Sequence, residues 1–170
     1  MHTLALALAL ALPGLAAGTT VLPLTREEIA ARSDTIVRAR VLVRTPARSE
    51  RTGRILTRTR LQVLETYKGK ARREIELEQM GGTLGGATLV VPGDARIDQG
   101  EEVVLHLRCE GKERCHLFGL ALGKFGVRSG PDGKRIAVRD LQGLSDSRSG
   151  PLGRDEIPLA TLERELRRRP

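Results

Sequence analysis

The chain has 170 residues, a length that fits one domain with one modest core. Aromatic residues make up only 2% of it, so the core must be aliphatic, and the chain is poor in the aromatic surfaces on which single-stranded nucleic acid usually stacks. The formal net charge of +8 favours anionic partners through long-range fields.

Residues 1–18 predict a secretory signal peptide. Residues 3–12 are an almost unbroken run of Ala and Leu, which Pro13 and Gly14 break before a group of small residues. This is the layout of a signal peptide and its cleavage site, and the run is shorter than the roughly 20 apolar residues of a spanning helix. A buried N-terminal helix is the alternative. We therefore expect a mature chain of residues 19–170, periplasmic or secreted, without a transmembrane segment.

A short helix is predicted over residues 26–32, because Thr25 and Glu28 have the spacing of a capping box at its start. The helix leads into two long segments, 34–45 and 54–66, in which apolar and polar residues alternate. Strict alternation over such lengths is a strong sequence signal for strands. We therefore expect two antiparallel strands joined by a polar linker.

Further strands complete a small β-barrel. Residues 73–79 alternate and predict the third strand of a meander. The glycine cluster 81–86 is typical of a sharp bend between strands, and 87–91 fit a short strand. Residues 101–109 predict a clear strand, which returns through 115–122 as a hairpin.

The C-terminal part predicts an extra hairpin, a loop and a helix. Residues 125–128 and 135–139 flank a Pro-Asp-Gly turn. Residues 141–155 suit a loop, and leucines at helical spacing after a proline predict a helix over 157–168. We expect a terminal helix to cover three residues that face away from the core: Val104, Phe118 and Leu120. The predicted core consists of Val37, Ala39, Val41, Val43, Leu61, Val63, Ile75, Leu77, Val103, Leu105, Leu107 and Leu117.

The two cysteines, Cys109 and Cys115, predict a disulfide across the hairpin, as expected in an oxidising compartment. His106 and His116 lie nearby, so a Cys/His zinc site is the alternative. Alternation along paired strands opposes it, because it places both cysteines on one face and both histidines on the other. We expect the disulfide and no metal.

Arginines crowd the first two predicted strands. By alternation, six of them share the outward face, a set that we call the arginine ribbon: Arg38, Arg40, Arg44, Arg54, Arg58 and Arg60. This ribbon could bind an acidic polysaccharide, lipid headgroups or an acidic protein. The alternative is a solvated face of an arginine-biased chain. Nucleic acid is not expected, because the ribbon carries no aromatic side chain.

Sequence patterns for catalysis are absent. Motifs of serine hydrolases, zinc peptidases and β-lactamases do not occur. The cluster 81–86 could suggest a phosphate cradle, but a phosphate-binding loop needs a lysine and a following helix. We therefore expect no catalytic residues and no cofactor.

Four segments together resemble the netrin-type module: SDTIVRARVLV (33–43), TRTRLQVLETYKGK (57–70), GGTLGG (81–86) and QGEEVVLHL (99–107). This family includes the inhibitory domain of the tissue inhibitors of metalloproteinases, and exported bacterial proteins of uncharacterised function are similar as well. The resemblance implies a closed five-stranded OB-type barrel and binding to extracellular proteins. Those inhibitors chelate zinc through an N-terminal Cys, whereas the mature chain here would begin near Thr19, so no inhibitory residue is carried over.

We therefore expect one exported, all-β domain, a small OB-like barrel of five-stranded Greek-key type with an extra hairpin and short N- and C-terminal helices. Its expected function is non-catalytic binding of an extracellular or periplasmic protein, and inhibition of that protein is one form that this binding could take. Binding of an acidic glycan or lipid headgroup through the arginine ribbon is the alternative. An enzyme of unknown type is the second alternative.

Overall fold

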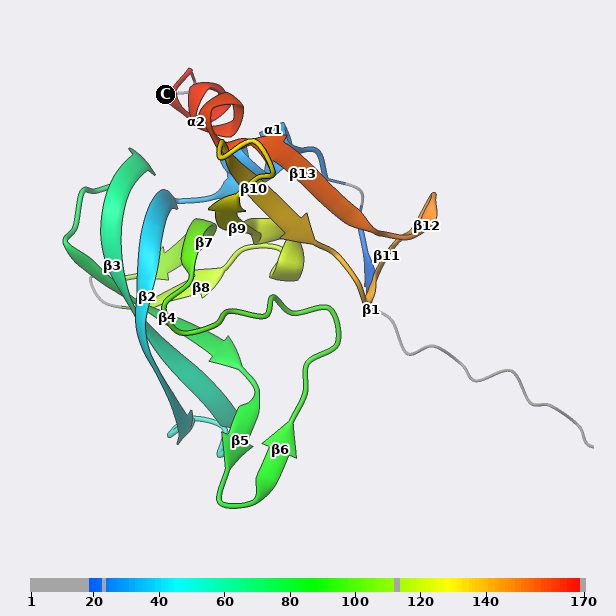
Figure 1. The fold of residues 1–170 in the computed structure, drawn as a ribbon. Helices are drawn as coiled ribbons and strands as arrows, with labels where there is room; N and C mark the ends of the chain where they lie inside the picture. The colour runs from blue at the N-terminus through cyan, green and yellow to red at the C-terminus, as the bar shows by residue number, and fades with distance from the viewer. Residues whose placement is uncertain (1–18, 23, 112–113, 169–170) are drawn as a thin grey trace, which may run out of the picture.

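The structure is a computed structural model that describes residues 19–22, 24–111 and 114–168 (Figure 1). The predicted signal peptide, residues 1–18, lies outside the described residues. In chain order the elements are β1 (Thr19–Val21), α1 (Arg26–Arg32), β2 (Thr35–Arg48), β3 (Ile55–Lys68), β4 (Glu74–Met80), β5 (Gly82–Leu84), β6 (Ala87–Leu89), β7 (Glu102–Glu110), β8 (Arg114–Leu117), the 3-10 turn η1 (Leu120–Gly123), β9 (Lys124–Ser129), β10 (Arg135–Asp140), β11 (Leu144–Asp146), β12 (Gly150–Pro151), β13 (Arg154–Pro158) and α2 (Leu159–Arg167).

Five strands close into a barrel. β2 pairs with β3, β3 with β4, β4 with β8, β8 with β7, and β7 pairs again with β2. The pairing of β4 with β8 is parallel, and the other four are antiparallel. This circuit is a closed five-stranded Greek-key barrel of the OB type, so the predicted fold class is confirmed.

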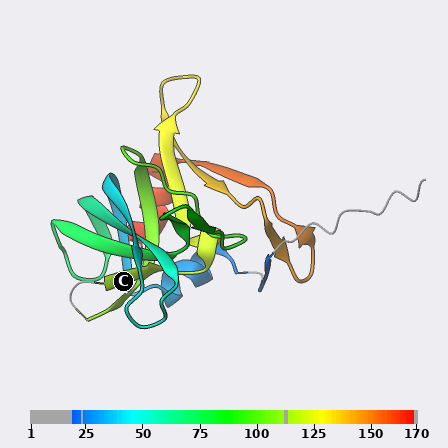
Figure 2. The same ribbon diagram turned by 90° about the horizontal axis from the view of Figure 1, so that it is seen from below.

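A second layer covers the barrel on the side of β7. β9, β10 and β13 continue the sheet outward from β7, and α1 and α2 lie against them (Figures 1 and 2). β7 is therefore buried on both faces. Its residues Val103, Leu105 and Leu107 belong to the barrel core. Val104 belongs to a second cluster beneath α2, as predicted, together with Ala30, Ile36, Phe125, Ala137, Ile157, Leu159, Leu162 and Leu166.

A bulge in β2 changes which residues face the core. Val41 pairs with Leu61, but the next paired residue is Val43, so Leu42 has no partner in β3. One extra residue inverts the alternation beyond it. Val43 consequently lies opposite Arg60 and is only half-buried, so its predicted place in the core was wrong.

β8 ends earlier than predicted. After Leu117 the chain turns through Gly119 and Leu120, whose φ angles are 75° and 57°, and enters η1. Phe118 and Leu120 are partly buried against the barrel cluster. The prediction that they lie on the opposite face was therefore wrong, because it extended strand alternation into a turn.

The segment 141–155 is not the single loop that was predicted. It contains β11, β12 and the start of β13, and β11 pairs in parallel with β1. β13 pairs with β10 as far as Pro158, so α2 begins at Leu159 rather than at 157. Near the N-terminus, α1 begins with the predicted capping box, in which Thr25 Oγ1 accepts a hydrogen bond of 3.1 Å from the Glu28 amide.

The predicted disulfide between Cys109 and Cys115 is confirmed. The two residues lie directly opposite each other in the β7–β8 ladder, with their Cα atoms 4.0 Å apart. Cys115 is buried within the barrel core, and Cys109 packs against it. The bond therefore ties the tip of the hairpin to the core.

Replacing both cysteines with alanine is expected to lower the free energy of unfolding by about 2 kcal/mol, because a short crosslinked loop restricts the unfolded chain. Urea unfolding monitored by circular dichroism measures the change. Reduced wild-type protein is the control for the side-chain volume that alanine removes. Equal stability of the oxidised and reduced wild type would contradict this account.

Candidate functional site

Two adjoining hollows lie on the outside of β3 and β4. One has a volume of about 700 Å³ and runs between the loop at residues 49–52 and the β7–β8 hairpin. A second, of about 590 Å³, adjoins it and shares Glu50, Arg58 and Arg114 with it. We call the two together the outer groove. In OB barrels this face and its flanking loops are the usual binding surface.

One end of the outer groove is apolar. Met80 on β4 lies directly opposite Leu56 on β3, and Ala47 on β2 lies opposite Leu56 on its other side. Residues opposite each other in a ladder point to the same face, so the three form one row across the barrel. Within this row Leu56 is fully buried, whereas Met80 is 39% exposed. Met80 is therefore an accessible apolar contact at this end of the groove.

The next two rows of the groove carry charges of alternating sign. Arg58 lies opposite Glu78, and its Nε is 3.5 Å from Glu78 Oε2. Arg60 lies opposite Glu76, which is in turn paired with Arg114 on β8. The acidic side chains of β4 thus lie between basic side chains of β3 and β8. Ion pairs this exposed are worth at most about 1 kcal/mol, so they leave the charges available to a partner.

Charges of both signs line the described part of the outer groove in equal number, five arginines and five glutamates. The arginines are Arg51, Arg58, Arg60, Arg72 and Arg114. The glutamates are Glu50, Glu74, Glu76, Glu78 and Glu110. A surface of this kind does not create the single-sign field that concentrates polyanions.

The predicted arginine ribbon does not form one surface. Arg58 and Arg60 line the outer groove. Arg44 lies opposite the buried Thr59, because the bulge at Leu42 moves it to the other face of the sheet. The remaining members, Arg38, Arg40 and Arg54, do not line the groove.

Arg38 and Arg40 instead belong to an ion-pair network between the barrel and the second layer. Glu102, at the start of β7, accepts a hydrogen bond of 2.9 Å from Arg38. It also lies 3.5 Å from Arg40 and contacts Arg135. Burial alone would raise the pKa of Glu102, but the hydrogen bonds from Arg135 and Arg38 outweigh it and lower the pKa. Arg38 also lies 3.2 Å from Glu163 of α2. These arginines have a structural role.

Sequence reasoning missed the acidic side of the outer groove. Glu74, Glu76 and Glu78 alternate with the buried Ile75 and Leu77, so their outward direction was readable from the sequence. Their basic neighbour on β8 was not readable, because the parallel pairing of β4 with β8 joins segments far apart in the chain.

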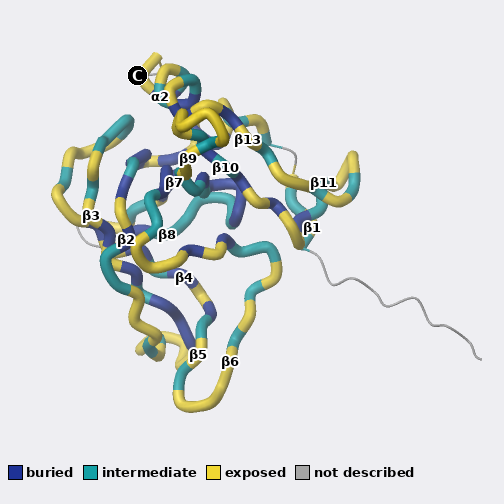
Figure 3. The backbone as a smooth tube through the Cα atoms, viewed as in Figure 1, coloured by how far each residue is buried: buried dark blue, intermediate teal, exposed yellow. Residues whose placement is uncertain are grey.

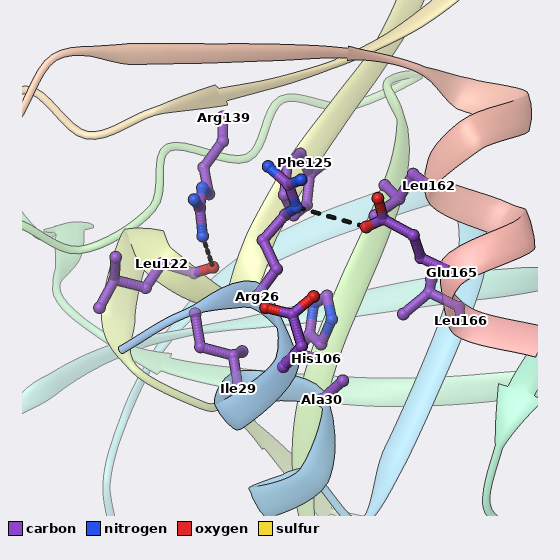
Figure 4. A pocket seen from close by; sticks show the side chains of 11 residues that line it. Arg26, Ile29, Ala30, His106, Leu122, Phe125, Arg139, Leu162, Glu165 and Leu166 are labelled. Carbon is purple, nitrogen blue, oxygen red and sulfur yellow. Dashed lines mark hydrogen bonds and ion pairs between the residues drawn. The ribbon is translucent and has the colours of Figure 1, made fainter. Parts of the chain in front are cut away.

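A separate, small hollow lies between α1, α2 and the sheet, as Figure 4 shows. Its volume of about 10 Å³ has room for about one water molecule. Arg26 lies 3.4 Å from Glu165 in it. Arg139 donates to the Leu122 carbonyl at 3.4 Å and stacks over Phe125. These side chains fill the space between the layers, so the hollow is a packing defect of the interior and not a ligand site.

His106 lines the same hollow and is 2% exposed. Burial lowers its pKa to about 4, although the Gly123 carbonyl, 3.3 Å from Nδ1, opposes the shift. His116 lies apart from it in the outer groove, with Nδ1 3.2 Å from the Glu78 carbonyl. Among the described residues, no three His, Cys, Asp or Glu side chains gather into a group that could hold a metal ion.

In comparisons with known proteins, no family model and no curated protein sequence matches the chain. Within the part of the chain that the structure describes, no helix is long and apolar enough to cross a membrane. The geometry of the outer groove is therefore the main support for a function.

The free energy of unfolding is expected to fall by about 3 kcal/mol as the pH is lowered from about 6.5 to about 4. Over this range the unfolded chain takes up a proton on His106, whereas the folded chain keeps this side chain neutral. Unfolding in urea at a series of pH values measures the fall.

His106→Leu should remove most of that pH dependence, because leucine fills the same site without titrating. His116→Gln, which changes the other histidine of residues 19–170, is the matched control and should retain it. An equal slope in wild type and His106→Leu would show that other groups cause the effect.

Proposed function

We propose that this protein is an exported, non-catalytic binding module whose outer groove binds a segment of another protein. The observation that carries the proposal is the groove itself, a hollow of about 700 Å³ in which one accessible apolar side chain, Met80, lies beside rows of alternating charge. A polypeptide segment can match both, because it presents apolar side chains and charges of either sign at fixed spacing. Interface centres of this kind combine an apolar anchor with a polar rim.

A polyanion is a poorer match for the same surface. A chain of negative charges along the groove would meet Glu74, Glu76 and Glu78 as closely as it meets Arg58 and Arg60. The three aromatic residues of the chain, one Tyr and two Phe, lie outside the groove, so it offers no stacking platform for bases. The balance of charge therefore favours a protein partner.

Export is part of the proposal. The disulfide between Cys109 and Cys115 suits an oxidising compartment, and the N-terminal residues have the composition of a signal peptide. Both features support a periplasmic or secreted location. Inhibition of an extracellular protease is a narrower form of the proposal, supported by the resemblance to netrin-type modules. It would have to act through the outer groove, because Thr19 replaces the zinc-chelating cysteine at the expected mature N-terminus.

Site-specific crosslinking tests where the partner binds. A photoreactive phenylalanine derivative replaces Met80 in the exported chain, which is then exposed to the native extracellular or periplasmic fraction and irradiated. Leu64 is the matched control, because it is 38% exposed, close to the 39% of Met80, and lies outside the groove on β3. One protein crosslinked from position 80 and not from position 64 supports the proposal.

Charge variants then test the mechanism with the purified partner. Arg58→Ala with Arg60→Ala is expected to weaken binding at least about tenfold, because both side chains line the groove. Arg40→Ala with Arg44→Ala removes two exposed arginines outside the groove and should leave the affinity unchanged. Isothermal titration calorimetry measures both.

Heparin serves as the polyanion probe in the same titrations. If heparin binds tightly and both double variants weaken its binding equally, the arginines act as a diffuse basic surface, and the proposed protein-binding function of the groove is wrong.

A further inference from the structure

The hairpin of β5 and β6 lies in the longest uncharged stretch of the described chain. Residues 79–93 contain no Asp, Glu, Lys or Arg, although such residues make up 29% of the sequence. The hairpin projects from the barrel beyond the end of β4 (Figure 1). It is mostly exposed at its tip and along β6 (Figure 3). A neutral, projecting strand pair on so basic a chain calls for a physical explanation.

The turn of the hairpin fixes which backbone groups face outward. Gly85 and Gly86 have φ angles of 58° and 79°, which identifies a two-residue turn of the type I′ kind. Leu84 and Ala87 flank the turn and form the hydrogen-bonded pair of the ladder. In the next pair, with Thr88 on β6, the amide and carbonyl therefore point away from β5.

The outer edge of β6 is short, three residues, but carries no charge. β5 is its one neighbour in the sheets formed by the described residues. Exposed edges normally carry a charge, a proline or a bulge that blocks another strand, but residues 87–91 read Ala-Thr-Leu-Val-Val. Val90, one step beyond β6, is 73% exposed. The lack of charge, proline and bulge over residues 87–91 and the exposure of Val90 favour the addition of a strand.

We infer that the edge of β6 pairs with β6 of a second copy of this chain, in antiparallel orientation about a two-fold axis. The second copy supplies a segment of the required kind, because residues 87–91 are uncharged and include the β-branched Thr88, Val90 and Val91. Net charge narrows the choice of contact surface. Two chains of charge +8 repel each other at low salt. Contact through projecting, neutral hairpins joins the copies while it keeps the charged barrels apart.

This dimer does not depend on the function of the outer groove, and salt distinguishes the two. Screening reduces repulsion between like-charged copies, so dimerisation through the hairpin is expected to strengthen as salt is raised. Binding through ion pairs in the groove is expected to weaken under the same conditions.

Sedimentation equilibrium of the exported chain, at low and high salt, is the experiment. Val90→Lys places a charge on the edge and is expected to weaken dimerisation at least about tenfold. Thr88→Pro removes an outward amide without removing a backbone hydrogen bond to β5, although it removes the contact between the Thr83 and Thr88 hydroxyls, and it should have the same effect. Leu22→Lys is the matched control, because Leu22 is 71% exposed and lies outside the hairpin; it should dimerise as the wild type does.

Two results would overturn the inference. A chain that stays monomeric at all concentrations and salt levels shows that another partner, or none, occupies the edge. A dimer that Val90→Lys and Thr88→Pro leave intact shows that the copies associate through another surface. Circular dichroism of each variant confirms that the loss of dimer is not a loss of fold.

Discussion

The burial of β7 on both faces is the constraint on which the rest of the structure depends. A strand at the surface of a small barrel can leave its outer face to water, but here that face carries Val104 and His106. Both need cover, and complete burial of a valine side chain alone stabilises the fold by roughly 1.5–3 kcal/mol. β9, β10 and α2 supply this cover. Because the second layer occupies that side of the barrel, the face of β3 and β4 remains open as the outer groove.

The same division separates the charges into two groups with different roles. On the covered side, Tyr67 donates to Glu163 at 2.6 Å and joins α2 to β3. Burial and this carboxylate raise the pKa of Tyr67, so the phenol remains a donor. On the open side, Arg58 is 38% exposed and lies 3.5 Å from Glu78 and 3.9 Å from Glu76. Charges of similar type therefore hold the layers together on one side and remain available to a partner on the other.

The sequence was informative where structure is local and misleading where it is not. The meander and the disulfide were predictable, because alternation and the spacing of Cys109 and Cys115 are visible over a few residues. The bulge at Leu42 was not, since it lies in a run of three apolar residues that fits either register. This single extra residue moves Arg44 to the other face of the sheet from the one predicted. The candidate site needed a fact that no local pattern contains, the parallel pairing that brings Arg114 beside Glu76.

The disulfide has a consequence for when the groove is complete. Glu110 and Arg114, on either side of the hairpin tip, form one wall of the groove, and the bond between Cys109 and Cys115 holds that wall to the core. Such bonds form in oxidising compartments and not in the reducing cytoplasm. A newly made chain would therefore carry every residue of the site while one wall was still untethered. Under the export proposed above, this wall is tethered only after the chain has left the cytoplasm.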